Sequence, residues 1–228
     1  MSAETHELRL CTLKRGIIYL RALGAMNKRD HEIVSSEELA DFLCLNDATI
    51  RRDLSAFGKL GTRGLGYRVG DLRTRLLEVA RPSKIVYGTV VGVGRLGAAL
   101  LGHGGLLRVP GLVIRAAFDV DVQKIGSMVG SVRILDASEM VDIVKRERIA
   151  VGIVTVPTEA AQGVVDRLVE GGVSGILNFT ATHVAAGPGV AVSNIDISLE
   201  LESLLLSLRE KARDPYRGGN ARESGSSI

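Results

Sequence analysis

The sequence lacks the features that mark secreted, membrane-spanning or metal-binding proteins. No apolar stretch follows a basic start at the amino terminus, so we expect no signal peptide. The longest stretch without Asp, Glu, Lys or Arg, residues 171–195, is interrupted by glycines, a proline and a histidine, which argues against a membrane span. Cys11 and Cys44 lie in apolar helical patterns without metal-ligand spacing, so they predict buried, reduced thiols in a cytoplasmic protein.

A strong charge of either sign is also missing. Lys and Arg number 29 against 26 Asp and Glu, and a net charge of +3 identifies no partner by itself. A hydrophobic content of 46% and a charged content of 24% are typical of an ordinary globular protein. With 228 residues, the chain has room for one large domain, or for a small domain joined to a medium one.

A glycine pattern within residues 85–101 indicates a nucleotide-binding turn. An apolar, β-branched run ends at Val91, and Gly92, Gly94 and Gly97 lie between it and an apolar helical pattern. Glycines at this spacing between a strand and a helix are typical of dinucleotide-binding folds. Gly92 would allow the tight turn, Gly94 would let the backbone approach a pyrophosphate, and Gly97 would let the helix pack closely on the strand.

An acidic residue is expected where the second strand of such a fold ends, because its carboxylate binds the adenosine ribose hydroxyls and repels a 2′-phosphate. Asp119 meets this expectation, directly after the strand-like residues 112–118. It follows Gly92 by 27 positions, more than is usual, and the glycine-rich residues 102–111 account for the excess. A sheet that keeps its glycines for packing alone is the alternative.

Residues 5–80 show the pattern of a winged helix. Apolar residues at helical spacing predict three helices. The first covers about 5–26, and the second is short, with Ser35 or Ser36 as its cap and Glu37 or Glu38 in its first turn. The third covers 48–57, with Asp47 as its cap. Two helices separated by a short turn predict a helix-turn-helix. Glycines punctuate residues 58–69, which predicts a hairpin that serves as a wing, and a further helix covers 72–80.

The local charge supports DNA binding by this region. Between residues 49 and 75, seven basic residues stand against two acidic ones, although a solvated surface helix can carry such charge by chance. Recognition-helix residues would read the major groove, while wing cations would contact phosphate or the minor groove. The candidate DNA-binding residues are Thr49, Arg51, Arg52, Ser55, Lys59, Arg63, Gly64 and Tyr67.

Past Pro82, strands alternate with helices, which predicts a Rossmann-type, doubly wound parallel sheet and an α/β fold class. The predicted strands are 84–91, 112–118, 131–135, 150–156, 173–179 and 190–194, and the predicted helices are 95–103, about 121–127, 138–148 and 158–170. The predicted domains are a winged helix-turn-helix domain over 1–82, a dinucleotide-binding domain over 83–197, a C-terminal dimerisation helix over 198–213 and a disordered tail over 214–228.

The helix predicted over 198–213 is more apolar than a free terminal helix should be. A partner subunit would cover it, and a two-fold dimer is also what two helix-turn-helix half-sites require. A helix that docks on its own domain is the alternative.

A winged helix joined to a dinucleotide fold resembles the Rex family of redox-sensing transcriptional repressors. The phrase Thr49-Ile-Arg-Arg-Asp-Leu54 is shared with sugar-responsive repressors of the DeoR type. More specific phrases follow in the family's order: Phe57-Gly58 with Gly61-Thr-Arg-Gly-Leu-Gly-Tyr67, Val91-Gly-Val-Gly-Arg-Leu-Gly-Ala-Ala-Leu100, Ala117-Phe-Asp-Val-Asp121 with Lys124-Ile-Gly126, Ile153-Val-Thr-Val-Pro157 with Ala161-Gln162, Asn178-Phe179, and Asn194-Ile-Asp196.

The resemblance implies a homodimer that exchanges its C-terminal helix, binds palindromic operators in double-stranded DNA when NADH is low, and is released by NADH. NADH and NAD⁺ are the implied cofactors, and Arg21 would pair with Asp196 at the subunit interface, either as a switch or as a plain structural ion pair. The implied cofactor-binding residues are Gly92, Val93, Gly94, Arg95, Leu96, Gly97, His103, Asp119, Val120, Lys124, Thr155, Val156, Pro157, Asn178 and Phe179.

Three positions depart from the family's pattern. His103 replaces the usual tyrosine close to the nicotinamide, Ala56 replaces a tyrosine in the recognition helix, and residues 180–184 replace a proline-containing loop. A repressor on the same scaffold with a different or lost effector is therefore the alternative function.

An NAD-dependent dehydrogenase is the rival of another class. Hydride transfer needs a substrate pocket with a proton donor, and residues 83–228 leave little beyond the nucleotide fold. His103 and His183 lie in no recognisable catalytic phrase, so we expect no enzyme and no catalytic residues. A sugar-phosphate-responsive repressor would share the DNA-binding module, but it should not carry Asp119 after a dinucleotide loop.

Overall fold

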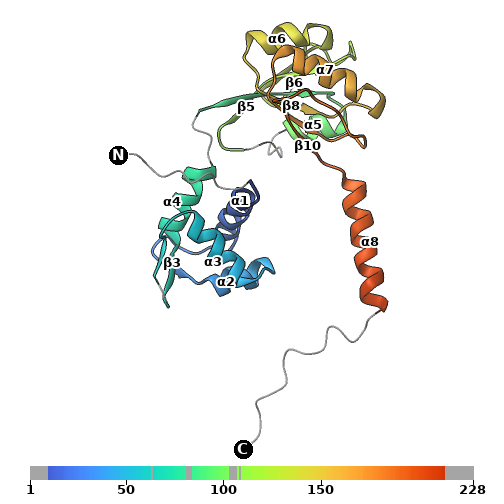
Figure 1. The fold of residues 1–228 in the computed structure, drawn as a ribbon. Helices are drawn as coiled ribbons and strands as arrows, with labels where there is room; N and C mark the ends of the chain where they lie inside the picture. Colours follow the sequence, from blue (N-terminus) through green and yellow to red (C-terminus); the bar gives the residue numbers. More distant parts are fainter. Residues whose placement is uncertain (1–9, 63, 81–83, 103–106, 108, 214–228) are drawn as a thin grey trace, which may run out of the picture. The chain divides into compact units, whose positions relative to one another are not determined.

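The computed structural model describes residues 10–62, 64–80, 84–102, 107 and 109–213 (Figure 1). Chain contacts divide it into two compact units, Met1–Lys84 and Ile85–Ile228. The predicted start of the first helix at residue 5, and the tail predicted to be disordered over 214–228, lie outside the described residues.

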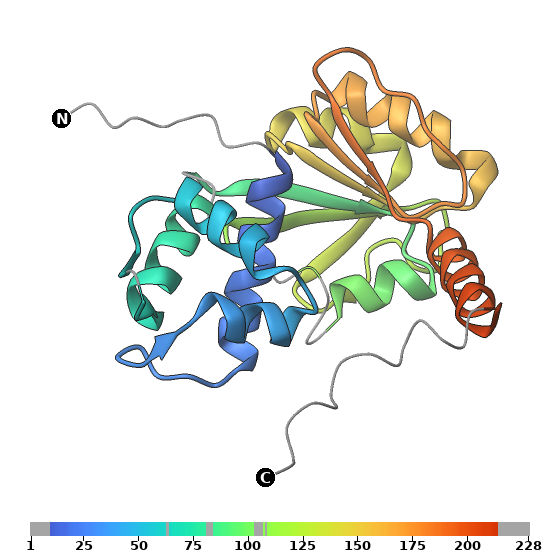
Figure 2. The same ribbon diagram turned by 60° about the horizontal axis from the view of Figure 1, so that its bottom comes forward.

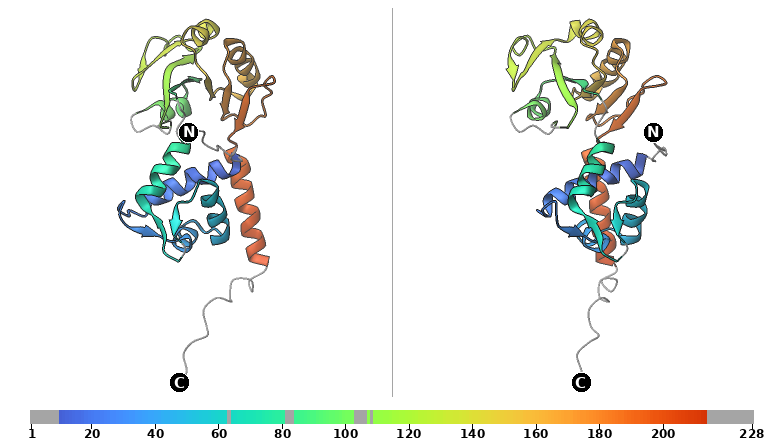
Figure 3. Two further views of the ribbon diagram at one scale, coloured as in Figure 1. Left: turned by 60° about the vertical axis from the view of Figure 1, so that its left-hand side comes forward. Right: turned by 90° about the vertical axis from the view of Figure 1, so that its left-hand side faces the viewer.

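The first unit holds the predicted helix-turn-helix and wing (Figure 3). The wing strand β3 lies between β1 and β2 and pairs with both in antiparallel fashion. The helices are α1 (Leu10–Ala25), α2 (Ser36–Leu43), α3 (Asp47–Ala56) and α4 (Val69–Ala80), and the strands are β1 (Ile33–Val34), β2 (Gly61–Thr62) and β3 (Gly66–Arg68).

Apolar residues at helical spacing hold this unit together. Ile50, Leu54 and Phe57 recur every three or four positions along α3, and all three are buried. The Phe57 ring lies against α1 at Gly16, where a Cβ atom would come within 2.6 Å of it. Gly16 therefore sets how closely α1 approaches the end of α3.

The start of α2 follows the predicted capping box. The Ser35 hydroxyl accepts the backbone N–H of Glu38, and the Glu38 carboxylate accepts the N–H of Ser35 in return. The predicted cap of α3 is wrong, because the Asn46 side chain accepts the backbone N–H of Ala48, whose nitrogen lies 2.8 Å away. Asp47 lies in the first turn instead and forms an ion pair with Arg51.

A buried carboxylate ties α3 to α1. Asp53 is 3% exposed, and its two oxygens form an ion pair with Arg15 and accept the Tyr19 hydroxyl at 2.6 Å. Burial alone raises the pKa of Asp53, but hydrogen bonds from Arg15 and Tyr19 outweigh burial and keep that pKa below its usual value. The carboxylate is therefore charged at neutral pH and joins the two helices.

The second unit is a seven-stranded sheet in the order β10-β9-β8-β4-β5-β7-β6. All neighbours pair in parallel except β6 and β7. Without β6, this is the strand order of a dinucleotide-binding Rossmann fold, as predicted. The strands are β4 (Val86–Val91), β5 (Leu112–Asp119), β6 (Met128–Val129), β7 (Val132–Asp136), β8 (Val151–Val154), β9 (Gly175–Asn178) and β10 (Ala191–Asn194).

Helices cover both faces of this sheet (Figure 2). On one face α6 and α7 bury the larger apolar cluster, which includes Phe118, Met140 and Leu168, and α5 covers the other face through Leu100. The helices are α5 (Arg95–Leu101), α6 (Met140–Arg146) and α7 (Ala161–Gly171), with 3₁₀ turns at Ala137–Glu139 and Thr158–Ala160.

The helix predicted over about 121–127 is wrong. Asp119 and Asp121 accept backbone N–H groups two residues further along the chain, which favours turns over a helix. Gly126 has a φ of 89°, and it leads into β6 and an antiparallel hairpin with β7. The chain therefore leaves β5 through a turn that places residues 120–124 beside the end of β5, and it reaches β7 by way of β6.

Both cysteines are exposed, so the prediction of buried thiols is also wrong. Cys44 ends α2 in the left-handed conformation, with a φ of 53°. The apolar neighbours that suggested burial belong to a helix that has already ended at that position.

The predicted C-terminal helix is present as α8 (Ile197–Arg213). Asp196 caps it, because its carboxylate accepts the backbone N–H groups of Ser198 and Leu199 at 3.0 and 3.1 Å. Its aliphatic side chains are more than half exposed in the single chain: Ile197, Leu199, Leu201, Leu204, Leu205, Leu206 and Leu208.

We predict that Asp53→Asn destabilises the first unit by about 2 kcal/mol at pH 7, because it leaves Arg15 without a buried counter-charge. The native pKa of Asp53 is lowered, so its stabilising effect is present above the unfolded pKa of about 4 and is lost as the pH falls through the native value. Hydrogen exchange of α1 and α3, measured by mass spectrometry, reports the change.

Asp47→Asn is the matched control, because it removes an exposed i, i+4 ion pair that contributes about 0.5 kcal/mol. Equal losses in the two variants, or a difference between wild type and Asp53→Asn that does not shrink towards pH 3, would contradict the assigned role of Asp53.

Candidate nucleotide and nucleic-acid sites

Four predicted cofactor residues gather at the carboxyl edge of the sheet. Gly92 follows β4, Asp119 ends β5, Thr155 follows β8 and Asn178 ends β9. The strand order reverses between β4 and β8, which are neighbours although the chain visits β5 and β7 between them. Ligands of open parallel sheets bind at such a reversal, outside the carboxyl ends of the strands.

The three loop glycines have different surroundings. Gly92 has a φ of 91°, and a Cβ there would lie 2.7 Å from the Thr155 carbonyl oxygen. A Cβ on Gly97 would lie 2.1 Å from the Gly92 carbonyl oxygen, whereas one on Gly94 would meet no atom within 4 Å. Gly92 and Gly97 are therefore required by the fold, and Gly94 is the glycine that faces open space.

The other loop residues surround this opening. Val93 is buried, whereas Arg95 and Leu96 are exposed in the first turn of α5. Thr155 ties the loop to β8, because its hydroxyl lies 2.6 Å from the Gly92 carbonyl oxygen. Val156 and Pro157 continue from Thr155 along the same edge of the sheet, half-buried and exposed respectively.

Asp119 connects the end of β5 to the glycine loop. It is 8% exposed, and it accepts the backbone N–H groups of Val93 at 2.8 Å and Asp121 at 2.9 Å. The Lys124 amine lies 3.2 Å from the same carboxylate. Burial alone raises the pKa of Asp119. The hydrogen bonds from Asp121, Val93 and Lys124 outweigh burial and leave that pKa below its usual value, so the group is an anion.

Val120 lies directly beyond this carboxylate and is 82% exposed. An exposed aliphatic side chain next to Asp119 fits the flat face of a purine base better than it fits water. His103, the predicted substitute for the nicotinamide tyrosine, lies outside the described residues.

Asn178, a predicted cofactor residue, makes its hydrogen bonds within the protein. It is fully buried, and its amide donates to the Asn194 side chain at 2.9 Å and to the Thr182 carbonyl at 2.7 Å. Its own oxygen accepts the backbone N–H and the hydroxyl of Thr180. The side chain thus folds loop 180–184 against β10, while Phe179 is half-buried at the edge of the sheet.

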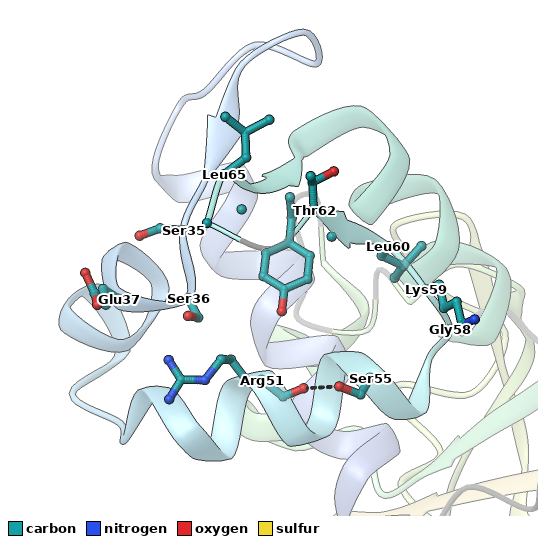
Figure 4. Close-up of a pocket in the computed structure, with 14 residues that line it drawn as sticks. Ser35, Ser36, Glu37, Arg51, Ser55, Gly58, Lys59, Leu60, Thr62 and Leu65 are labelled. Atoms are coloured by element: carbon teal, nitrogen blue, oxygen red, sulfur yellow. Dashed lines mark hydrogen bonds between the residues drawn. The ribbon is translucent and has the colours of Figure 1, made fainter.

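In the first unit, a groove of about 600 Å³ lies between α3 and the wing (Figure 4). Five of the predicted DNA-binding residues line it, namely Arg51, Ser55, Lys59, Gly64 and Tyr67. Figure 4 shows Arg51 and Ser55 on α3, facing the wing. The groove thus brings together polar side chains from two elements that the sequence assigned separately.

The remaining predicted DNA contacts lie elsewhere. Thr49 is half-buried and Arg52 is exposed on α3, and Arg63 lies outside the described residues. The start of α2 also lines the groove through Ser35, Ser36 and Glu37, which were considered as capping residues alone. The free backbone N–H groups at the start of a helix favour anions, so the position of this helix start next to the recognition helix could have indicated a contact to phosphate.

Two of the seven basic residues counted in this region serve the fold. Arg75 donates from its Nε atom to the Phe57 carbonyl oxygen at 2.7 Å, which ties α4 to the end of α3. Arg73 forms an ion pair with Asp30 at 2.6 Å. The local positive charge therefore overstates the number of cations that face the groove.

The two residues of the predicted Arg21–Asp196 pair lie in different units. Arg21 is exposed on α1 of the first unit, and Asp196 caps α8 in the second. Their pairing stays a prediction.

Among the described residues, no helix has the length and apolar content needed to span a bilayer.

A winged helix with a polar groove, joined to a Rossmann unit with a carboxylate beside its glycine loop, defines the class of ligand-responsive DNA-binding regulators. Comparisons with known proteins agree. A family described as "CoA binding domain" matches residues 85–182, and one described as "Putative DNA-binding protein N-terminus" matches residues 10–55.

Individual relatives cover nearly the whole chain. A redox-sensing transcriptional repressor Rex from Listeria welshimeri is 39% identical over 208 residues, which is 91% of this chain and 96% of the relative. The crystal structure of RSP in complex with β-NAD⁺ and operator DNA superposes with a TM-score of 0.81 at 27% identity, covering 94% of this chain and 99% of RSP. The RSP complex with β-NADH has a TM-score of 0.80 at 26% identity, covering 92% and 99%.

The chain belongs to the Rex family of redox-sensing transcriptional repressors. The predicted resemblance and fold are thereby confirmed, as is the prediction of a repressor rather than an enzyme.

The glycines of the loop give a matched pair of variants. We predict that Gly97→Ala lowers the free energy of unfolding by about 2 kcal/mol, because the added Cβ overlaps the Gly92 carbonyl oxygen. Gly94→Ala should change it by less than about 0.5 kcal/mol, since its Cβ would enter open space. Urea denaturation followed by circular dichroism measures both, and equal losses would contradict the different surroundings of the two glycines.

Proposed function

We propose that this chain is a homodimeric repressor that binds a palindromic operator in double-stranded DNA and is released from it by NADH. The observation that carries the proposal is the Asp119 carboxylate, held beside the glycine loop by the Val93 N–H. A carboxylate at that position accepts ribose hydroxyls and disfavours a 2′-phosphate, which selects NADH and NAD⁺.

The relatives support this choice of ligands. RSP has been crystallised with β-NADH, and with β-NAD⁺ together with operator DNA. In this chain, the pyrophosphate would lie over Gly94 and the adenosine ribose at Asp119, with Val120 against the adenine. Thr155, Val156 and Pro157 would border the nicotinamide half, together with His103.

DNA binding would use the groove of the first unit and the exposed residues around it. Arg51, Arg52, Ser55 and Thr49 on α3 would face base edges in the major groove, while Lys59, Arg63, Gly64 and Tyr67 of the wing would contact the phosphate backbone. The wing cations supply salt-dependent affinity, and α3 supplies sequence preference.

Dimerisation would use the C-terminal helix α8. The exposed leucines of α8 need a covering surface, and a second subunit supplies one. In this proposal residues 1–82 bind DNA, residues 83–197 bind nucleotide and residues 198–213 dimerise. Arg21 and Asp196 would pair at the subunit interface, and the repressor would act in the cytoplasm.

Release follows from linkage between the two sites. If NADH favours a subunit arrangement in which the two α3 helices no longer match their half-sites, it lowers DNA affinity, and DNA lowers NADH affinity by the same factor. A coupling of about 1–3 kcal/mol corresponds to a roughly 5- to 150-fold change in DNA affinity.

We predict that NADH releases the dimer from a labelled palindromic operator of the Rex type at concentrations where NAD⁺ has little effect. Fluorescence anisotropy during separate titrations with the two nucleotides measures this. Tight operator binding that is indifferent to both nucleotides would contradict redox sensing and support the alternative, a repressor on this scaffold with another effector or none.

We predict that Arg51→Ala weakens operator binding by about tenfold, because Arg51 lies in the groove between α3 and the wing. The affinity for NADH, measured without DNA, should stay unchanged. Arg146→Ala is the matched control, since Arg146 is an exposed arginine on α6 of the other unit. Unchanged operator affinity in Arg51→Ala would remove that residue from the DNA interface.

A further inference from the structure

The turn after β5 places a lysine at the expected ribose position. The Lys124 backbone N–H donates to the Asp121 carbonyl at 2.9 Å, which folds the chain back towards the end of β5. The Lys124 amine then lies 3.2 Å from the Asp119 carboxylate and 3.5 Å from that of Asp121. Its side chain is 39% exposed, so the ammonium group also faces solvent.

The acceptor capacity of Asp119 is nearly used before any nucleotide binds. Its two oxygens offer about four acceptor positions, and the N–H groups of Val93 and Asp121 together with the Lys124 amine occupy three. A ribose diol has two hydroxyls to donate. The diol must therefore displace the Lys124 amine or donate one hydroxyl elsewhere. In both cases the Lys124 side chain is a neighbour of the ribose.

We propose that Lys124 is a specificity-determining residue that weakens the discrimination of Asp119 against 2′-phosphorylated nucleotides. Lys124 is a cation able to bind phosphate, and its ion pair with Asp119 neutralises it until such a nucleotide binds. This inference rests on the proposed binding of NADH beside Asp119. A cation near the ribose is the device by which related folds accept a 2′-phosphate. Here that cation is present, and the neighbouring carboxylates neutralise it.

The charges around the site give the direction of the effect. Asp119 and Asp121 repel a 2′-phosphate, and Lys124 offsets one of the two negative charges. Removing the lysine leaves the repulsion unopposed. Removing the charge of Asp119 leaves Lys124 with Asp121 alone, and a phosphate that carries nearly two charges competes well for that ammonium.

The experiment compares the dissociation constants of NADPH and NADH by calorimetry at low salt, in the full-length dimer. Lys124→Gln should raise the ratio of NADPH to NADH constants about fivefold, because only the phosphorylated nucleotide gains from the ammonium charge. Asp119→Asn should lower the ratio at least tenfold, and its amide oxygen still accepts the Val93 N–H. In the double variant most of that gain in NADPH affinity should be lost.

Lys145→Gln is the matched control, because Lys145 is an exposed lysine on α6. Its ratio should equal that of the wild type, and thermal unfolding by circular dichroism checks that each variant is folded. The Lys124 effect should also shrink as salt is added, since the lysine is partly exposed.

The outcomes separate this inference from the proposed function. If wild type binds neither NADH nor NADPH, both are wrong. If wild type binds NADH but Lys124→Gln leaves the ratio within twofold of wild type, alone and in the Asp119→Asn background, the proposed function stands and the role of Lys124 is wrong. A lower ratio in Lys124→Gln than in wild type also overturns it.

Discussion

The second unit depends on one buried carboxylate. Asp119 joins the end of β5 to the loop after β4 through the Val93 N–H, and it organises the turn that follows through the Asp121 N–H. Each backbone N–H would be costly to bury without an acceptor. The same anion thus shapes the glycine loop, and in the proposed function it supplies the charge that selects the ribose.

The first unit also contains a buried carboxylate, and the comparison shows how surroundings decide a role. The partners of Asp53 are two side chains, Arg15 and Tyr19, that close around it and leave it 3% exposed. Asp119 is held chiefly by backbone groups, and its side-chain partner Lys124 is itself 39% exposed. A carboxylate enclosed by side chains fixes two helices, whereas one held by backbone retains a side from which a ligand can approach.

The sequence predicted the fold better than it predicted side-chain partners. The strand–glycine–helix pattern and the spacing of α3 depend on local periodicity, which a sequence shows directly. The turn at 121–126 was missed because the side chains of Asp119 and Asp121 accept backbone N–H groups two residues further along the chain, a local competition that helical periodicity does not contain. The partners of Asn178 in loop 180–184 and β10 are tertiary contacts, which the sequence pattern did not show.

Charge counting illustrates the same limit for nucleic-acid binding. A net excess of cations over residues 49–75 describes a DNA-binding surface only if those cations are free to meet phosphate, and Arg75 already donates to the carbonyl at the end of α3. Arg73 is paired with Asp30, so it cannot neutralise a phosphate without losing that partner. Because the salt dependence of DNA binding reports the phosphates neutralised, it should follow the cations of α3 and the wing and not the larger number in the sequence.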